Sequence, residues 1–298
     1  MYRKTANMNR ETYAVIGCNG QLGSELKELS ANLPIDFKFY DYPEIDITKK
    51  DELLEILRKD APGAIINCAA YTAVDKAETE KDAALAVNGI GVKNLADVAK
   101  AIDAWLIHVS TDYVFDGTSC RPYAETDATN PQSVYGATKL QGEVFATSYR
   151  KGIVIRTAWL YSTFGNNFVK TMLRLGNERE SLNVVFDQVG TPTYAHDLAK
   201  AILAAAEKAT ATNDTNLAGI YHYSNEGVCS WYDFTREIFD IERIACKLSP
   251  IETKDYPTPA KRPHFSVFNK KKIKATFGIE IPHWKHSLIE CLNKLNSK

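Results

Sequence analysis

A tyrosine and a lysine lie four positions apart in the segment SVYGATKLQGE, which spans residues 133–143. These residues are Tyr135 and Lys139, and most of their neighbours favour a helix. Because a helix turns once every ~3.6 residues, this spacing places the phenol and the ammonium on one face. A neighbouring ammonium favours the phenolate and lowers the pKa of a tyrosine, which makes the pair a candidate acid or base for a carbonyl or an alcohol. Taken alone, a surface tyrosine packed on a lysine stem is the simpler interpretation.

A hydroxyl group completes the pair. An apolar run ends in HVSTDYVFDG, which places Ser110 and Thr111 at the carboxyl end of an expected strand. The hydroxyl of Thr111 could bond the same substrate oxygen as Tyr135 and orient it. Lys139 could also hold the ribose of a nicotinamide cofactor. The set Thr111, Tyr135 and Lys139 is therefore suited to the proton transfer that accompanies hydride transfer.

A glycine-rich segment near the amino terminus indicates a dinucleotide site. In AVIGCNGQLGSEL the spacing is G-x-x-G-x-x-G, between an apolar strand pattern and an amphipathic helix pattern. Such glycines let the backbone approach a pyrophosphate, and the first N–H groups of the helix face the anion. The next strand pattern ends near Asp41, whose carboxylate could bond both hydroxyls of an adenosine ribose and so favour NAD over NADP. A turn aspartate is the alternative for Asp41, and Asp46 could reach the adenine amino group.

Strand and helix patterns alternate through the first half of the chain. This rhythm predicts an α/β fold, a Rossmann-type doubly wound parallel sheet with helices on both faces. Small residues at the end of the third strand, Ala69 and Ala70, would leave room for the cofactor there. His108 lies inside the fourth expected strand and is predicted to be a core residue. The expected strands are 13–18, 36–42, 63–70, 104–115 and 152–161, and the expected helices are 21–33, 49–60, 80–102 and 133–149.

The rhythm changes after residue 161, which predicts a smaller mixed α/β lobe for the substrate. The expected dinucleotide-binding domain comprises residues 11–160 plus 190–212, and the expected lobe comprises 161–189 plus 213–298. Three prolines in YPTPAKRPH, residues 256–264, indicate an extended segment. Residues 1–10 are expected to form a disordered extension, with Met8 as a candidate start.

Bulk properties narrow the classes of partner. The 298 residues carry 36 basic and 37 acidic side chains, which argues against nucleic acid and anionic membranes as partners. The six cysteines contain no C-x-x-C pair, so neither a zinc site nor a disulfide framework is indicated, and no metal ligands are predicted. No apolar run is long enough for a membrane helix, and the polar start lacks the features of a signal peptide, so the expected location is cytoplasmic.

The glycine spacing together with Tyr-x-x-x-Lys resembles the extended short-chain dehydrogenases/reductases. Longer segments, among them INCAAYTAVDKAE, STDYVFDG, DQVGTPTYAHDLA and PTPAKRPHFSVFNKKKI, resemble the dTDP-4-dehydrorhamnose reductases of that group. The resemblance runs from about Thr12 to near the carboxyl terminus. It implies an oxidoreductase that uses NADPH or NADH to reduce the 4-keto group of dTDP-6-deoxy-L-lyxo-4-hexulose. The product would be dTDP-L-rhamnose, a precursor of O-antigen and other cell-surface polysaccharides.

The resemblance also implies roles for individual residues. Tyr135 would donate the proton, Thr111 would polarise the keto oxygen, and Lys139 would tune Tyr135 and bind ribose. Expected cofactor contacts are Gly17, Gly20, Gln21, Leu22, Gly23, Asp41, Asp46, Ile47, Ala69, Ala70, Tyr71, Val109, Tyr135 and Lys139. Expected substrate contacts are Thr111, Asp112, Tyr135, Trp159, Asn166, Asn167 and Arg262. Some members are reported with Mg²⁺, but the carboxyl-terminal region shows no clear carboxylate cluster, so the sequence does not support that ion.

Several assignments have a plainer alternative. Trp159 could fill the core, Asn166 and Asn167 could be turn residues or helix caps, and Arg262 could be a solvated surface charge. The whole protein could be a non-catalytic NAD(P)-binding regulatory subunit, although the complete Thr111, Tyr135 and Lys139 set favours an enzyme. A reductase or epimerase of another nucleotide sugar is the other alternative. A monomer and a homodimer are both compatible with the sequence.

Overall fold

The computed structural model describes residues 11–297, so the expected extension at 1–10 lies outside the described residues. Within this range the centre is a six-stranded parallel sheet in the order β2-β1-β3-β4-β5-β10. The strand order reverses at β1, because β2 lies on one side of it and β3 on the other. Ligands of open parallel sheets bind beyond the carboxyl ends of the strands at such a reversal. The strands are β1 (Thr12–Ile16), β2 (Asp36–Tyr40), β3 (Ala64–Asn67), β4 (Trp105–Thr111), β5 (Gly152–Thr157) and β10 (Gly219–His222).

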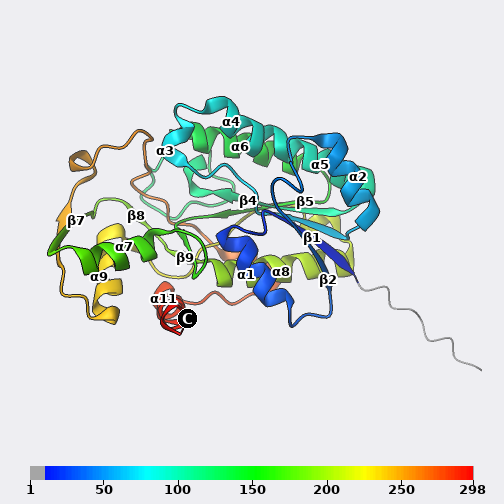
Figure 1. Cartoon of the computed structure of the whole chain (residues 1–298). Coiled ribbons are helices and arrows are strands. Elements are labelled where there is room, and N and C mark those ends of the chain that lie inside the picture. The colour runs from blue at the N-terminus through cyan, green and yellow to red at the C-terminus, as the bar shows by residue number, and fades with distance from the viewer. Residues whose placement is uncertain (1–10, 298) are drawn as a thin grey trace, which may run out of the picture.

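Helices cover both faces of this sheet (Figure 1). One face carries α2 (Lys50–Asp60), α5 (Val92–Ile102) and α6 (Val134–Thr147). The other carries α1 (Gln21–Ser30) and the alanine-rich α8 (Ala195–Thr212), which pack on each other. Because both faces are covered, β3 and β5 are buried at every position. The predicted doubly wound Rossmann-type sheet is confirmed.

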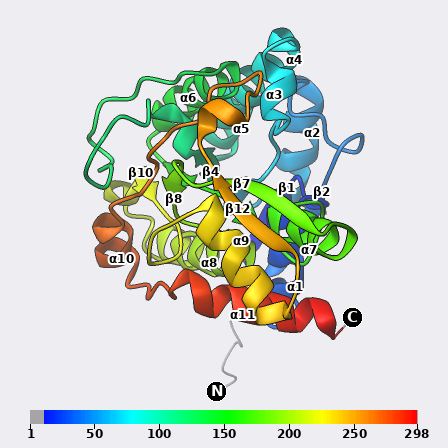
Figure 2. The ribbon, with the colours of Figure 1, turned by 90° about the vertical axis from the view of Figure 1, so that its left-hand side faces the viewer.

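Most of the rest of the chain forms a group of short elements at one end of the molecule (Figure 1). There β7 and β12 run parallel beside α7 and α9, as Figure 2 shows. These elements share an apolar cluster that includes Val169, Phe234 and Trp284. They are β6 (Leu160–Tyr161), α7 (Phe168–Glu178), β7 (Ser181–Val185), β8 (Val189–Gly190), β9 (Thr193–Tyr194), β11 (Cys229–Ser230), α9 (Trp231–Glu242), β12 (Lys247–Ile251) and α11 (Trp284–Asn296). The short helix α10 (Lys271–Phe277) instead packs beside β10 and α8 of the main sheet.

The division of the chain into two domains stays a prediction. One segment expected in the second lobe, β10, pairs with β5 in the main sheet. No helix within residues 11–297 has both the length and the apolar character that crossing a membrane requires. Four short helical turns complete the fold: α3 (Val74–Ala77) and three 3₁₀ turns, η2 (Asp112–Val114), η3 (Thr215–Leu217) and η4 (Thr253–Asp255).

The helix expected over 80–102 is present without a break from Lys81 to Ile102, but its middle is π-helical. The structure has α4 (Lys81–Leu85), then a π-helical stretch η1 (Ala86–Gly91), then α5. The wider turn directs Asn88 away from the helix, where its side chain accepts from the amide of Tyr71 (2.9 Å) and donates to the Tyr71 carbonyl (3.1 Å). Asn88 is 1 % exposed, and its two hydrogen bonds with the Tyr71 backbone fix the loop that follows β3. Such bulges are frequent at functional sites.

A buried ion pair holds α6 against the sheet. Both oxygens of Glu143 on α6 accept from Arg156 on β5, Oε1 from Nε at 2.9 Å and Oε2 from Nη2 at 2.7 Å. The two side chains are each 2 % exposed. The Arg156 guanidinium also lies 5.0 Å from the ring centroid of Phe115. This bidentate geometry fixes the helix that carries Tyr135 and Lys139.

We expect Glu143→Ala to lower the free energy of unfolding by about 3–5 kcal/mol, because the guanidinium of Arg156 would stay buried without its counter-charge. Denaturant unfolding measures this change. The matched control is Glu178→Ala, which removes the partner of Arg174 in a pair exposed by 59 % and 53 %. That exposed pair should contribute less than about 1 kcal/mol. Equal losses in the two variants would contradict the assigned role of Glu143.

Candidate active site

One cavity of about 780 Å³ runs along the carboxyl ends of the central strands. Its walls include the loop after β1, the ends of β2, β3, β4 and β5, and the start of α6. The cavity therefore occupies the place that the reversal of strand order predicts. It brings together almost all of the side chains that the sequence singled out, although they come from six separate segments.

The glycine loop lies at the carboxyl end of β1. Gly17 has φ +82°, a conformation that side chains rarely adopt, and the amides of Gly17 and Cys18 donate to the carbonyl of Tyr40 (2.9 and 3.1 Å). The first turn of α1 has no side-chain cap, in contrast to α6 and α7. Its N–H groups are the natural partners of a phosphate.

Asp41 fixes the far side of this loop. One carboxylate oxygen accepts from the amide of Asn19 (2.7 Å) and the other from the amide of Tyr42 (2.8 Å). A carboxylate has further lone pairs, so ribose hydroxyls could still bond it. Asp46 accepts from both the amide and the hydroxyl of Thr48, and the hydroxyl is the main reason that the pKa of Asp46 is lowered.

The expected cofactor contacts line this cavity with one departure. Tyr71 does not line it, because its hydroxyl donates to Glu80 on the molecular surface. The lining residues that agree with the expectation are Gly17, Gly20, Gln21, Leu22, Gly23, Asp41, Asp46, Ile47, Ala69, Ala70, Val109, Tyr135 and Lys139. Their roles toward a cofactor stay predictions.

The proposed catalytic set lies where β4 meets α6. The Thr111 hydroxyl donates to Asp112 (3.0 Å) and accepts from the amide of Tyr113 (3.2 Å). Burial raises the pKa of Tyr135 to about 12, which outweighs the lowering by a hydrogen bond with Thr111. Lys139 is 2 % exposed and donates to the carbonyl of Val109 (2.6 Å). Burial lowers the pKa of Lys139 to about 8.

These directions differ from the simple expectation for a tyrosine beside a lysine. The expected lowering of the Tyr135 pKa by Lys139 is not what the structure shows, because burial has the larger effect. A raised pKa keeps the phenol protonated at neutral pH. That state suits a proton donor, which a reduction needs.

Three buried polar atoms in the cavity wall have no hydrogen-bond partner among the described residues. They are the hydroxyls of Ser110 and Thr157 and one carboxylate oxygen of Asp112. Buried polar atoms are nearly always paired, so three together indicate a place for a polar ligand. Burial also raises the pKa of Asp112 to about 6. Thr157 was missed from the sequence, where its only signal is its position at the end of a strand.

Trp159 forms an aromatic wall and lines the cavity. Its ring stacks on Trp231 with centroids 3.5 Å apart, so the expected pocket position and a packing role coexist. Its backbone has φ +48°, which is strained for so large a residue. Asn166 lines the cavity. Asn167 does not, because it caps α7 through the amide of Lys170 (3.1 Å), which agrees with the plainer alternative.

Arg262 has a protein partner in this structure and does not line the cavity. Its two terminal nitrogens donate to the two oxygens of Asp75 on α3, at 3.1 and 2.9 Å. Asp75 also accepts from the amide of Ala260 (3.1 Å). The segment 256–264 is thus tied to the loop that follows β3, and Figure 2 shows its orange trace beside α3. The pKa of Asp75 is lowered, chiefly by this arginine.

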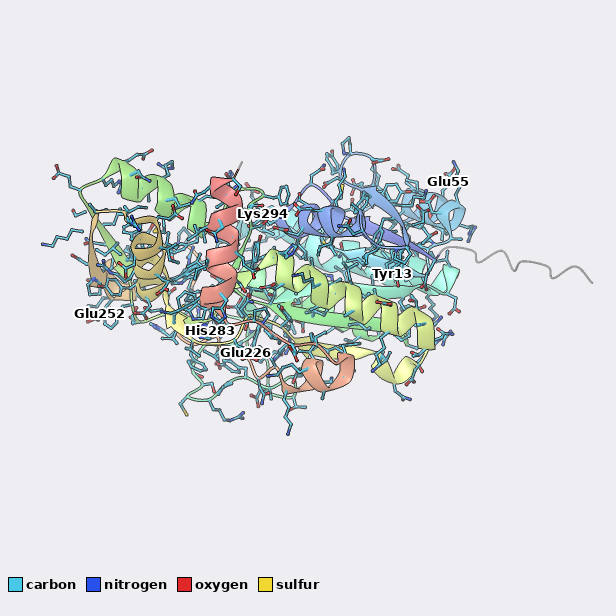
Figure 3. All side chains as sticks on the ribbon, turned by 90° about the horizontal axis from the view of Figure 1, so that it is seen from below. Tyr13, Glu55, Glu226, Glu252, His283 and Lys294 are labelled. Atoms are coloured by element: carbon cyan, nitrogen blue, oxygen red, sulfur yellow. The ribbon has the colours of Figure 1, made fainter. Side chains whose placement is uncertain are left out.

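One group of potential metal ligands occurs among residues 11–297, away from the cavity: Glu25, Glu28 and His196. Lys294 of α11 already pairs with Glu28 and lies 3.7 Å from Glu25, and Figure 3 shows it between α11 and α1. The buried Glu25 also accepts from Ser162 (2.6 Å). Because a lysine and a hydroxyl already pair with this group, it does not support the Mg²⁺ reported for some members.

Comparisons with known proteins agree with this geometry. The family model described as "RmlD substrate binding domain" matches residues 12–297. The dTDP-4-dehydrorhamnose reductase of Aggregatibacter actinomycetemcomitans is 44 % identical over 283 residues, which cover 92 % of this chain and 96 % of the relative. The chain belongs to the dTDP-4-dehydrorhamnose reductase family.

Solved structures of dTDP-4-dehydrorhamnose reductases share the fold closely. The Clostridium acetobutylicum reductase has a TM-score of 0.90 at 43 % identity, over 96 % of this chain and 99 % of that one. The Bacillus anthracis reductase, solved in complex with NADP, has a TM-score of 0.89 at 38 % identity, over the same shares of the two chains. Membership of this family makes the chain an oxidoreductase that uses a nicotinamide cofactor.

We expect Asp41→Ala to weaken NADH more than NADPH, because the carboxylate would bond the free ribose hydroxyls of NADH but repel the 2′-phosphate of NADPH. Dissociation constants of both cofactors at one ionic strength measure this difference. Asp41→Asn is the matched control, since it keeps one acceptor oxygen for the amide of Asn19 and removes the charge, at the expense of the bond from the amide of Tyr42. An equal loss of both cofactors in the alanine variant would make Asp41 a loop residue only.

Proposed function

We propose that this protein reduces the 4-keto group of dTDP-6-deoxy-L-lyxo-4-hexulose and releases dTDP-L-rhamnose. The observation that carries the proposal is the placing of Thr111, Tyr135 and Lys139 in the same cavity as the glycine loop. A dinucleotide bound along that loop would present its nicotinamide to the side chains at the ends of β4 and β5. The dTDP-sugar is the proposed partner, and a cytoplasmic location belongs to the same proposal.

The donor set of the cavity fits such a cofactor. The uncapped start of α1 offers N–H groups to a pyrophosphate, and Asp41 offers lone pairs to a ribose. The cofactor supplies the hydride. The unpaired hydroxyls of Ser110 and Thr157 provide donors for amide or sugar oxygens. Lys139 stands close enough to the cavity surface to be part of its lining.

The residues of this chain would handle the proton and the orientation of the substrate. The phenol of Tyr135 donates its proton to the keto oxygen as the oxygen becomes negative. The Thr111 hydroxyl turns from Asp112 toward the same oxygen and stabilises the developing charge. Asp112, buried beside Thr111, then bonds a sugar hydroxyl with its unpaired oxygen. Trp159, with the ring of Trp231 stacked on it, provides an apolar wall for the 6-deoxy side of the sugar.

The direct test incubates the pure protein with NADH or NADPH and the dTDP-4-keto sugar. We expect oxidation of the cofactor coupled to formation of dTDP-L-rhamnose, with one product molecule for each cofactor consumed. Assays with the corresponding UDP-4-keto and GDP-4-keto sugars test whether the enzyme prefers the dTDP nucleotide. If the protein binds the cofactor but oxidises none, it is a regulatory subunit. If it reduces a UDP-sugar or GDP-sugar faster than the dTDP-sugar, the proposed substrate is wrong.

Tyr135→Phe should lower kcat by about 10²–10⁴-fold while cofactor affinity changes little, because the phenol is the group proposed to give its proton to the keto oxygen. Steady-state assay and cofactor fluorescence titration measure the two effects. Tyr113→Phe is the control, since its ring packs edge-on to Tyr135 with centroids 5.4 Å apart. A Tyr135 variant that keeps a third or more of the parental kcat would remove this residue from the mechanism.

Arg262 is the proposed contact for the diphosphate of the substrate, because a guanidinium matches phosphate oxygens with two donors. It would have to exchange Asp75 for the diphosphate. Arg262→Ala should then raise KM for the sugar nucleotide about ten-fold, since a charge-assisted hydrogen bond contributes roughly 1.5–3 kcal/mol. Cofactor affinity should stay nearly unchanged.

Asp75→Asn separates this role from a structural one. It weakens the hold on Arg262, so KM should fall or stay constant if the arginine binds the diphosphate. If Arg262 only ties its segment to α3, both variants should change KM in the same direction and by similar factors.

A further inference from the structure

A buried polar chain lies behind Lys139, outside the cavity. Asn67 at the end of β3 and His108 within β4 are both 0 % exposed and face each other in the register of the two strands. Neither residue lines the cavity. The chain runs from the backbone after β3 through these two side chains to the lysine.

The direction of the hydrogen bonds in this chain follows from one backbone group. The amide of Ala69 can only donate, and it donates to Oδ1 of Asn67 (3.1 Å). The NH₂ group of Asn67 is therefore the one that faces Nδ1 of His108, at 3.0 Å. Since Nδ1 accepts, the proton of a neutral ring must be on Nε2. Burial holds the pKa of His108 well below 6.5, with the charge of Lys139 as the second cause, so the ring is neutral.

The Nε2–H of His108 then points at the lysine nitrogen, 3.5 Å away. The ammonium of Lys139 has the Val109 carbonyl as an acceptor (2.6 Å). On the side of His108, the ammonium faces the Nε2–H group, which is also a donor. Two facing donors disfavour the charged form of Lys139. A neutral amine at the same place would accept a hydrogen bond from Nε2–H instead.

Other ionisable groups around Lys139 do not remove this asymmetry. Tyr135 lies on the same helix with a raised pKa, and burial raises the pKa of the Cys68 thiol to about 12, so both are neutral. Glu143 is the one acid on α6 near the lysine, and Arg156 holds both of its oxygens. Burial lowers the pKa of Lys139, against the smaller raising effects of Glu143 and Cys68.

We propose that Asn67 and His108 are positioning residues that fix which proton faces Lys139 and thereby set its charge. The ring tautomer imposed by Asn67 makes the lysine give up its proton more easily than a lysine that faces an acceptor. The consequence for catalysis rests on the proposed function: the charge beside Tyr135, which stabilises the phenolate left after proton donation, is lost on the alkaline side. The network thus defines the upper pH limit of turnover.

The first measurement is the tautomer of His108 itself. Nitrogen-15 NMR of histidine-labelled protein distinguishes the Nε2–H form from the Nδ1–H form and from the imidazolium. The spectrum of His108→Phe identifies the signal by its loss. We expect the Nε2–H form at neutral pH, and finding either of the other two forms overturns the proposal.

The second measurement changes the direction of the chain. Asn67→Asp keeps an acceptor for the amide of Ala69 but offers His108 an acceptor in place of a donor. The ring proton should move to Nδ1, so that Nε2 accepts from the ammonium. The pKa of Lys139 should then rise by about one unit or more. Lysine Cε carbon-13 titration measures it, with Lys139→Met to assign the signal.

The added charge of the aspartate is controlled by combining the substitutions. In Asn67→Asp with His108→Phe there is no ring to reorient, so the rise should shrink to the part caused by charge alone. A rise of the same size in the double variant overturns the proposal. So does a ring that changes tautomer while the Lys139 titration stays in place.

Turnover provides the link to function. The alkaline limb of kcat should move upward in Asn67→Asp by the shift that NMR records for Lys139, while the acid limb stays fixed. If the alkaline limb of kcat does not shift together with the pKa of Lys139, the proposed effect on turnover is contradicted. The NMR titrations need no substrate. A protein that gives the expected titrations but does not reduce the keto sugar would therefore contradict the proposed function without contradicting the proposed role of Asn67 and His108.

Discussion

The close docking of α6 on the sheet is the constraint on which the site depends. This helix carries Tyr135 and Lys139, and two contacts fix its distance from its neighbours. A Cβ on Gly142 would lie 2.3 Å from the carbonyl of Asn88, so only glycine allows η1 to approach this closely. On the sheet side, Glu143 and Arg156 close a buried bidentate pair. A helix held from both sides cannot shift, and positioned groups contribute to catalysis only while they stay within reach of the reacting atoms.

The same docking sets the charges of the site. Bringing α6 against β4 buries Lys139 and half-buries Tyr135, and loss of water disfavours the charged form of each. The two pKa values therefore move apart, up to about 12 for the phenol and down to about 8 for the ammonium. The attraction between phenolate and ammonium alone, which the spacing of Tyr135 and Lys139 predicts, would lower the pKa of the phenol. Burial is a property of the assembled fold, and four-residue spacing on one helix contains no information about it.

Particular residues show where sequence reasoning succeeds. The glycine loop, the strand ends and the Tyr-x-x-x-Lys pair depend on local spacing, and the structure brings all of them to one cavity. The contacts of Asn88 in the π-helical turn and the pairing of Arg262 with Asp75 depend on partners distant in the chain. Asp75 and Arg262 are far apart in sequence, so nothing local could identify that pair. His108 was correctly expected in the core, but its tautomer follows from Asn67 and the Ala69 amide, which only the register of β3 and β4 reveals.

Several residues that destabilise the fold locally lie together in the wall of the cavity. Trp159 takes a strained backbone conformation, and the hydroxyls of Ser110 and Thr157 and one oxygen of Asp112 are buried without partners. Unpaired buried polar atoms each cost about 1–3 kcal/mol, and their bonds are recovered when a ligand supplies the missing donors and acceptors. All four residues lie at the ends of β4 and β5 or just after them, beside Tyr135. A ligand with donors and acceptors of its own could complete the bonds of these atoms, so the wall at this end of the cavity favours a polar ligand over an apolar one.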